Sequence, residues 1–197
     1  MCHAFLTDTK FYQLLTRIDE SIAEEARARG CDCGGVLHSA RYRRKPRGLR
    51  SALDSSYESR LSFCCEQDGC RRRSTPASVR FLGRKVYLSV IVVLITALHH
   101  GLTDQRRRRL IEALDVPAQT LWRWRRWWRE QFLESRCWKG LAGQFIPPIV
   151  TNSLPGSLLE RLSGRALSER LVQLLVLISP VTTSSSSLRV SRDPQKM

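Results

Sequence analysis

Residues 120–130 read TLWRWRRWWRE, and this short stretch decides how the chain can be interpreted. Four tryptophans and four arginines share these eleven residues. A tryptophan side chain is large and apolar and needs cover, whereas an arginine stays charged and suits a phosphate or a guanine base. The stretch therefore predicts a helix with one face that packs against the protein and one face that binds an anion.

The two faces of this helix follow from the spacing of its residues. We expect the helix to begin near Pro117 and to continue to about residue 134. Leu121, Trp124 and Trp128 fall on one face and should pack in the core. The opposite face, which we expect to contact DNA, carries Gln119, Trp122, Arg123 and Arg126.

The segment before this helix reads LIEALDVPAQ (residues 110–119) and predicts the end of another helix and a tight turn. Thr103 can cap that preceding helix at its start. A helix, a turn and a basic helix are the parts of a helix-turn-helix unit, which places its second helix in the major groove of duplex DNA. Duplex DNA is therefore the partner that this region favours.

Individual roles follow from position along such a recognition helix, because its first two turns reach the base edges. We expect Gln119 to pair with adenine, Arg123 to pair with guanine, and Thr120 to touch a thymine methyl group or a phosphate. Arg126 and Arg129 lie further along and suit phosphates. The arginine run of the preceding helix should also contact phosphates, through Arg106, Arg107, Arg108 and Arg109.

The overall charge agrees with an anionic partner. The chain has 33 Lys and Arg against 18 Asp and Glu, which gives a net charge of +15. The basic residues are clustered, which favours nucleic acid first and an anionic membrane second, with a solvated basic surface as the alternative. The longest apolar run, residues 86–98, is shorter than the about 20 residues that span a bilayer, and no signal peptide is visible. We expect a buried helix there, no membrane contact and a cytoplasmic, nucleoid-associated protein.

Seven cysteines, an odd number, favour metal ligands or buried thiols over a disulfide framework. Two close groups of cysteines flank two segments that look like strands, residues 36–42 and 59–64, with a basic loop between them. Thiolates bind Zn²⁺ tetrahedrally, and this layout is typical of a zinc ribbon. Zinc is the expected cofactor, with inert buried thiols as the alternative. The expected ligands are Cys31, Cys33, Cys65 and Cys70, with Cys64 and His38 as substitutes.

A second basic block, RYRRKPRGLR (residues 41–50), lies in the loop of this ribbon. A projecting basic arm of this kind can lie along phosphates or enter a minor groove. The side chains expected to contact DNA there are Arg43, Arg44, Lys45 and Arg47. Further basic residues, residues 71–73, Arg80, Arg84 and Lys85, extend the block along the chain.

The ends of the chain complete the predicted organisation. Residues 8–29 form a helix that Thr9 can cap, with an apolar stripe that includes Leu14. Residues 157–178 form one or two leucine-bearing helices. The fold class is therefore mostly α, a three-helix helix-turn-helix unit with a small β zinc-ribbon-like insertion and C-terminal helices. The expected regions are an N-terminal helix (1–30), the ribbon module (31–76), the helix-turn-helix domain (77–135), the C-terminal helical region (136–180) and a disordered tail (181–197).

Three segments together carry a resemblance to a known class of protein. They read CDCGGVLHSARYRRKPRG, CCEQDGCRRRSTPASVRFLGRKVYL and VPAQTLWRWRRWWRE. This layout resembles bacterial insertion-sequence transposases, in which a cysteine-pair zinc ribbon precedes a helix-turn-helix. The resemblance implies binding of transposon ends or target DNA. A full transposase also needs acidic residues that hold two Mg²⁺ ions on a strand-rich sheet, and the C-terminal region shows no such pattern.

Three readings of the function remain open. The first is a non-enzymatic DNA-binding protein related to mobile elements, which works with a separate catalytic transposase subunit. The second is a helix-turn-helix transcriptional regulator that forms a homodimer through its C-terminal helices. The third is a non-catalytic or decayed protein that binds RNA or a protein partner.

Overall fold

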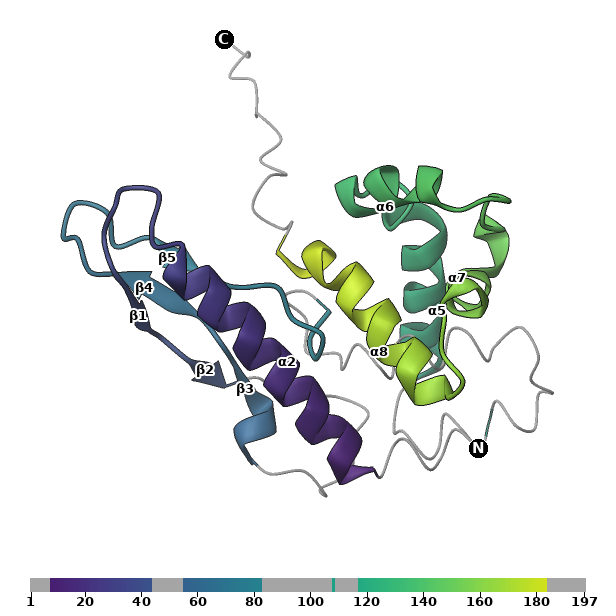
Figure 1. The fold of residues 1–197 in the computed structure, drawn as a ribbon, viewed down its shortest axis with the longest axis horizontal. Coiled ribbons are helices and arrows are strands. Elements are labelled where there is room, and N and C mark those ends of the chain that lie inside the picture. Colours follow the sequence, from purple (N-terminus) through teal and green to yellow (C-terminus); the bar gives the residue numbers. More distant parts are fainter. Residues whose placement is uncertain (1–7, 44–54, 83–107, 109–116, 184–197) are drawn as a thin grey trace, which may run out of the picture.

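The computed structural model describes residues 8–43, 55–82, 108 and 117–183. Most of its regular structure is helical and a smaller part is antiparallel strand, so the mostly α class is confirmed. In the view of Figure 1 the long helix α2 crosses the strands, and α8 lies between α2 and the group formed by α5, α6 and α7. The helices expected over residues 86–98 and 103–114 lie outside the described residues, apart from Arg108.

The helices of the described ranges have the following bounds: α2 Thr9–Ala28, α5 Ala118–Arg126, α6 Arg136–Leu141, α7 Gly156–Arg161 and α8 Leu167–Ile178. Short 3₁₀ turns cover Ser55–Glu58, Ala142–Gln144, Thr151–Ser153 and Ser179–Thr182 (η5). None of these helices combines the length and the apolar character needed to cross a lipid bilayer. The sequence predicted one or two helices over residues 157–178, and the structure has two helices in this region, α7 and α8.

Helix α2 lies within the predicted range, but its N-cap is one residue earlier than the sequence suggested. The carboxylate of Asp8, not the Thr9 side chain, accepts hydrogen bonds from the backbone N–H groups of Lys10 and Phe11. Asp8 satisfies donors that would otherwise lack partners in the first turn. Leu14, expected on the apolar stripe, is exposed because the buried positions follow a narrower line along the helix.

Short antiparallel strands lie against the second half of α2. Their bounds are β1 Leu37–Ser39, β2 Tyr42–Arg43, β3 Ser59–Arg60, β4 Phe63–Cys65 and β5 Arg73–Ser74. Strands β1, β4 and β5 form one sheet in that order, and β2 pairs with β3. The two strand segments that the sequence predicted therefore pair with each other. Strand β5 was not predicted from the sequence. A small core of Ala23, Ala26, Leu37, Phe63 and Cys65 joins this sheet to α2.

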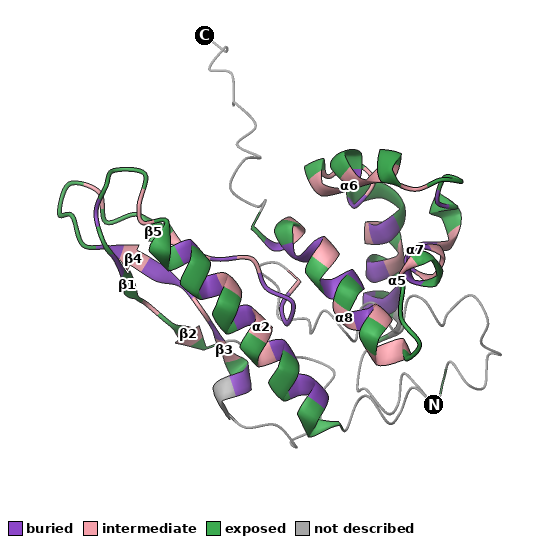
Figure 2. Ribbon diagram, viewed as in Figure 1, coloured by how far each residue is buried: buried purple, intermediate pink, exposed green. Residues whose placement is uncertain are grey.

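Helix α5 and its continuation bury the residues that the spacing assigned to the core. Pro117 stands just before the first turn, and Leu121, Trp124 and Trp128 are buried. Figure 2 shows buried stretches on α5 in purple. The last part is a π-helix, Trp127–Gln131, closed by the N–H of Phe132 donating to the carbonyl of Trp127 at 2.9 Å. This wider turn brings side chains five residues apart together, so the Trp127 and Phe132 rings lie 5.5 Å apart.

The leucines of α8 belong to the same core. Leu171, Leu174, Leu175 and Ile178 are all buried within the chain, where they pack with the α5 residues and with the first half of α2. These positions are therefore not a surface through which a second copy can dock. The homodimer expected from them would need another face.

A buried ion pair connects α2 to the segment that leaves the sheet. The Arg80 Nε atom lies 2.8 Å from Asp19 Oδ2, and both side chains are almost wholly buried. Asp19 also accepts hydrogen bonds from the hydroxyl of Ser78 and the backbone N–H of Val79, each at 2.6 Å. Arg80 was expected in a basic surface block. The structure corrects this, because its charge is neutralised inside the protein.

The same network reaches the end of the described chain. The Thr182 hydroxyl accepts hydrogen bonds from the backbone N–H of Ser78 at 3.0 Å and from the buried guanidinium of Arg60 at 3.4 Å. Thr182 in turn donates to the carbonyl of Ser179. The disordered tail predicted from residue 181 therefore starts too early, because Thr182 is a buried part of the fold.

We expect Asp19→Asn to destabilise the protein strongly. The substitution leaves the Arg80 guanidinium buried without its counter-charge, and removing one partner of a buried pair costs about 3–5 kcal/mol. Urea unfolding followed by far-UV circular dichroism measures the loss. Asp68→Asn, which breaks the exposed pair with Arg71, is the matched control and should leave the midpoint unchanged. Equal midpoints for Asp19→Asn and wild type would show that the network is not stabilising.

Candidate functional site

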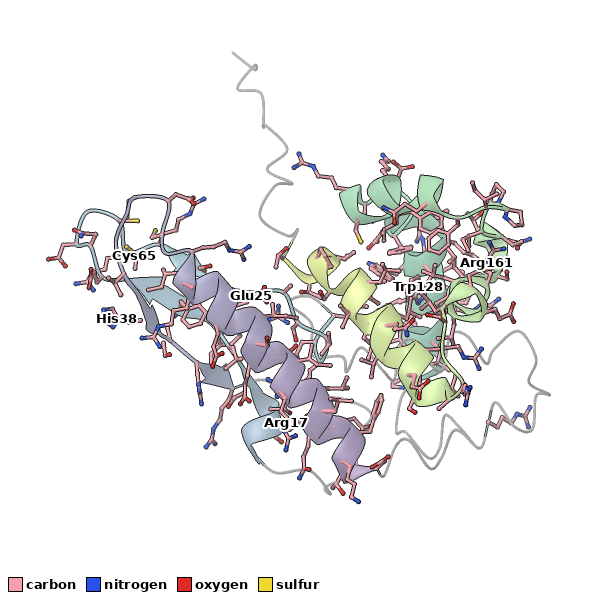
Figure 3. All side chains as sticks on the ribbon, viewed as in Figure 1. Arg17, Glu25, His38, Cys65, Trp128 and Arg161 are labelled. Atoms are coloured by element: carbon pink, nitrogen blue, oxygen red, sulfur yellow. The ribbon has the colours of Figure 1, made fainter. Side chains whose placement is uncertain are left out.

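Four cysteine thiols meet at one end of the sheet. The Sγ atoms of Cys31, Cys33, Cys65 and Cys70 all lie within 4.8 Å of one another, and Figure 3 shows sulfur atoms gathered near Cys65. Two of the distances are 3.7 Å (Cys31 to Cys70) and 3.5 Å (Cys33 to Cys65). Tetrahedral bonds of about 2.3 Å to a metal place sulfur atoms about 3.8 Å apart. These are the four cysteines that the sequence selected, and together they can hold a metal ion.

Two tight turns supply these thiols. The first follows α2, and in it the N–H of Gly34 donates to the carbonyl of Cys31 at 2.8 Å, with Gly34 at a positive φ of 83°. The second joins β4 to β5, and in it the N–H groups of Cys70 and Arg71 both donate to the carbonyl of Gln67 at 2.9 Å. A glycine accommodates the left-handed backbone of the first turn without strain.

Backbone N–H groups point at three of the four sulfur atoms. The N–H of Gly35 lowers the pKa of Cys33 to about 7, because a donor stabilises the thiolate. The N–H of Gln67 acts in the same way on Cys65, but burial and the other three thiols outweigh it and raise that pKa to about 12. One thiol of the group thus ionises readily while a neighbour keeps its proton. A bound cation would displace the remaining protons.

The same two opposing effects act on a third thiol, that of Cys70. The N–H of Arg72 lowers the pKa of Cys70, but hydrogen bonds with Cys33 and Cys31 raise it above its ordinary value. In each of the three cases the donor lies two residues after the cysteine. Such donors orient a thiolate ligand and compensate part of its charge.

Gly35 is required where the two turns meet. A Cβ atom on this residue would lie 2.7 Å from the Sγ of Cys65 and 2.6 Å from the Cγ of Gln67. Both distances are shorter than van der Waals contact allows, so any side chain here would push the turns apart. The sequence placed Gly35 beside the cysteines but gave no sign that it touches the opposite turn.

The two substitute ligands lie outside the thiol group. Cys64 points away from Cys65 because successive strand residues alternate in direction, and its Sγ lies 3.6 Å from the carbonyl oxygen of Arg71. The Nε2 atom of His38 lies 3.1 Å from a carboxylate oxygen of Glu66, and this hydrogen bond lowers the pKa of Glu66. Neither side chain belongs to the group of thiols.

The arginines around the thiol group lie at the surface, and each contacts a neighbouring side chain. Arg71 pairs with Asp68, and the Arg72 Nη1 atom lies 2.5 Å from the carboxylate of Asp32. The guanidinium of Arg73 lies over the ring of Tyr42, 5.9 Å from its centroid. Each arginine of residues 71–73 thus has a neighbour on the protein, and all three stay exposed to solvent.

The outward face of α5 is exposed as the spacing predicts. Gln119, Arg123, Arg126 and Arg129 are exposed, and Trp122 keeps 63% of its surface in solvent. The expected contact of Thr120 with DNA is corrected by the structure, because this residue is only 7% exposed. It lies one turn before Trp124 on the packed face and is out of reach of a thymine or a phosphate.

The remaining predicted DNA contacts divide between described and undescribed residues. Arg43, on β2, and Arg108 are exposed. The others lie outside the described residues: Arg44, Lys45, Arg47, Arg106, Arg107 and Arg109. The pairing of a preceding helix with α5, which would define a helix-turn-helix, lies outside them as well.

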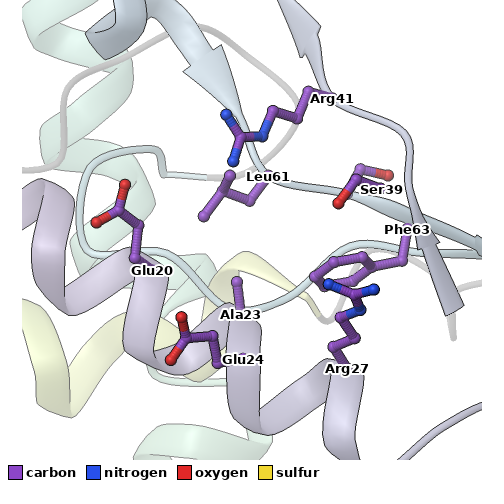
Figure 4. Close-up of a pocket in the computed structure, with 9 residues that line it drawn as sticks. Glu20, Ala23, Glu24, Arg27, Ser39, Arg41, Leu61 and Phe63 are labelled. Carbon is purple, nitrogen blue, oxygen red and sulfur yellow. The ribbon is translucent and has the colours of Figure 1, made fainter.

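A groove between α2 and the strands has a mixed charge. It has a volume of about 230 Å³, and Figure 4 shows Glu20, Glu24 and Arg27 on α2 facing Arg41 across a floor that includes Phe63. Carboxylates repel phosphate as strongly as the arginines attract it. The groove is therefore unsuited to a nucleic-acid backbone, and α5 is the better candidate.

Comparison with known proteins gave no match to a family model, to a curated protein or to a solved structure. The resemblance to insertion-sequence proteins stays a prediction.

We expect Gly35→Ala to weaken metal binding sharply, because the added methyl group collides with the Cys65 sulfur. Titration with Co²⁺, followed by its thiolate absorption bands, measures the affinity. Gly69→Ala is the matched control, since a Cβ there meets nothing within 4 Å. Identical titrations for wild type and Gly35→Ala would show that the two turns do not close around a metal.

Proposed function

We propose that this chain is a zinc-stabilised protein that binds duplex DNA through the outward face of α5. The observation that carries the proposal is a helix with two chemically different faces. Trp124 and Trp128 are buried behind it, while Arg123, Arg126 and Arg129 are exposed in front. The packed back fixes the helix, so that binding to DNA orders the arginine side chains but does not have to order the helix itself.

Zinc suits the thiol group better than harder cations do. Magnesium and calcium prefer oxygen ligands, whereas four thiolates at tetrahedral distances match a structural zinc site. Four thiolates also fill the coordination of the ion and leave no position for a substrate. We therefore assign the metal a structural role.

The need for the metal follows from the size of the core beside it. Within the described part of the chain, five buried residues and a few partly buried ones join the sheet to the second half of α2, and one of the five is the expected ligand Cys65. So little apolar area does not hold three short strands together without another stabilising link. Metal binding supplies that link by joining the turn after α2 to the turn between β4 and β5.

The DNA surface is assigned by position along α5. Gln119 and Arg123 lie in its first two turns, where side chains of a groove-bound helix reach base edges, and they suit adenine and guanine. Arg126 and Arg129 are placed for phosphates, and Arg43 belongs to a second basic region. A role in the movement of a mobile element, with a separate catalytic subunit, is consistent with this reading.

We expect the purified protein to contain one zinc ion per chain. Cys65→Ser should lose it, because the hydroxyl is a poor replacement for a thiolate. Cys64→Ser should keep it, since Cys64 lies outside the thiol group. Elemental analysis after dialysis measures the content. Equal zinc in both variants would contradict the assignment of the ligands.

We expect Arg123→Ala to cost about 1–3 kcal/mol on the preferred duplex and to relax base preference at one position. The preferred site is first selected from a random duplex library, and affinity is then measured by fluorescence anisotropy at several salt concentrations. Arg17→Ala removes the same charge from an exposed position on α2 and is the control. Equal weakening of all sequences by Arg123→Ala would make Arg123 a phosphate contact.

The same anisotropy measurements test the electrostatic part of the proposal. A protein that neutralises several phosphates loses affinity steeply with salt, because binding releases counterions. We expect the slope of log affinity against log salt to become shallower by about one for Arg126→Ala. An unchanged slope would place Arg126 away from the DNA backbone.

A further inference from the structure

Trp122 of α5 is exposed, whereas the other tryptophans of the described chain are buried or, for Trp127, half-buried. Trp124, Trp128 and Trp138 are at most 8% exposed, whereas Trp122 is 63% exposed. An indole ring left in water forgoes the stabilisation that its burial would bring. The stability of the fold therefore does not explain why Trp122 is exposed.

The surroundings of Trp122 form a small hollow. It has a volume of about 130 Å³ and is lined by Trp122, Arg125, Arg126, Arg129 and Glu130. These residues stand three, four, seven and eight positions after Trp122, which places them on one side of the helix. The Arg126 Nε atom lies 2.7 Å from a carboxylate oxygen of Glu130, which fixes one side of the hollow.

A fully paired duplex offers no base face on which the Trp122 ring could stack. Its base faces are stacked on one another, so that a protein in the major groove meets only base edges. The indole has a single N–H donor and no acceptor, which makes it a weak reader of edges. An unpaired base, by contrast, offers a full aromatic face, and stacking on a tryptophan is favourable for every base.

The charges of the hollow favour the same ligand. Arg125, Arg126 and Arg129 attract the phosphates on either side of a nucleotide. The carboxylate of Glu130 repels a phosphate inside the hollow but can accept a hydrogen bond from an amino group on a base. The base, not its phosphate, is therefore the part that suits the interior.

We propose that Trp122 stacks on an unpaired nucleobase, so that the preferred ligand is duplex DNA interrupted by an unpaired nucleotide. This inference rests on the proposed function, because it assigns a ligand class to the same face of α5. Arg123 and Gln119 then contact the adjoining paired bases, and the arginines of the hollow hold the phosphates that flank the unpaired nucleotide.

The test uses three labelled DNAs of one sequence: a fully paired duplex, the same duplex with one unpaired nucleotide, and that duplex with an abasic residue in place of the unpaired one. Fluorescence anisotropy gives the affinity of the full-length protein for each. We expect the unpaired nucleotide to improve binding about 5- to 100-fold over both other DNAs. Trp122→Leu, which keeps apolar bulk but lacks an aromatic face, should abolish this difference, and Trp122→Phe should keep most of it.

Controls separate stacking from other effects. Ile146→Ala removes another exposed apolar side chain and should leave all three affinities unchanged. Equal binding of the three DNAs by wild type overturns the stacking role, while weakening by Arg123→Ala would still support duplex binding. A preference that survives Trp122→Leu also overturns it. Failure to bind any of the three DNAs overturns both proposals.

Discussion

The buried pair of Asp19 and Arg80 is the interaction on which the two parts of this protein depend. Residues 76–82 carry almost no regular structure, yet several of their side chains are buried. Asp19 fixes this segment by accepting from Ser78, Val79 and Arg80 at once. Because polar groups away from water need partners, these bonds are what allow an irregular segment to lie inside the fold. Residues 76–82 also bind the turn that follows α8, because the backbone N–H of Ser78 donates a hydrogen bond to the hydroxyl of Thr182.

Helix α2 packs against both hydrophobic cores, and it therefore connects the turn that carries Cys31 and Cys33 to the core that supports α5. Its first half packs with α5 and α8 through Phe11 and Leu15, and its second half packs with the sheet through Ala23 and Ala26. The small residues of the second half let the strands approach closely. The thiol turn begins directly after this helix, so its position is fixed by the same element that supports the packed side of α5.

At the thiol group, part of the candidate site could be predicted from the sequence and part could not. The four cysteines that were expected to come together do so, because their order along the chain implies two turns that meet at one end of the sheet. The role of Gly35 was not visible, because it depends on Cys65 from the other turn. Likewise Thr120 was assigned to DNA from its position on the helix, and Arg80 to a basic surface block from its charge, although both residues are buried. The zinc itself and the DNA partner stay predictions.

The sequence by itself determined the local properties: where α2 and α5 run, which face of α5 packs, and which cysteines belong together. These follow from periodicity, breaking residues and side-chain chemistry, which act within a few residues. Only the tertiary structure decided which arginines are surface charges and which are buried bonds. Arg123 and Arg80 are chemically identical, but Arg80 meets Asp19, sixty-one residues away along the chain. The free energy of a buried charge is set by the partner that folding brings to it, and no local pattern contains that partner.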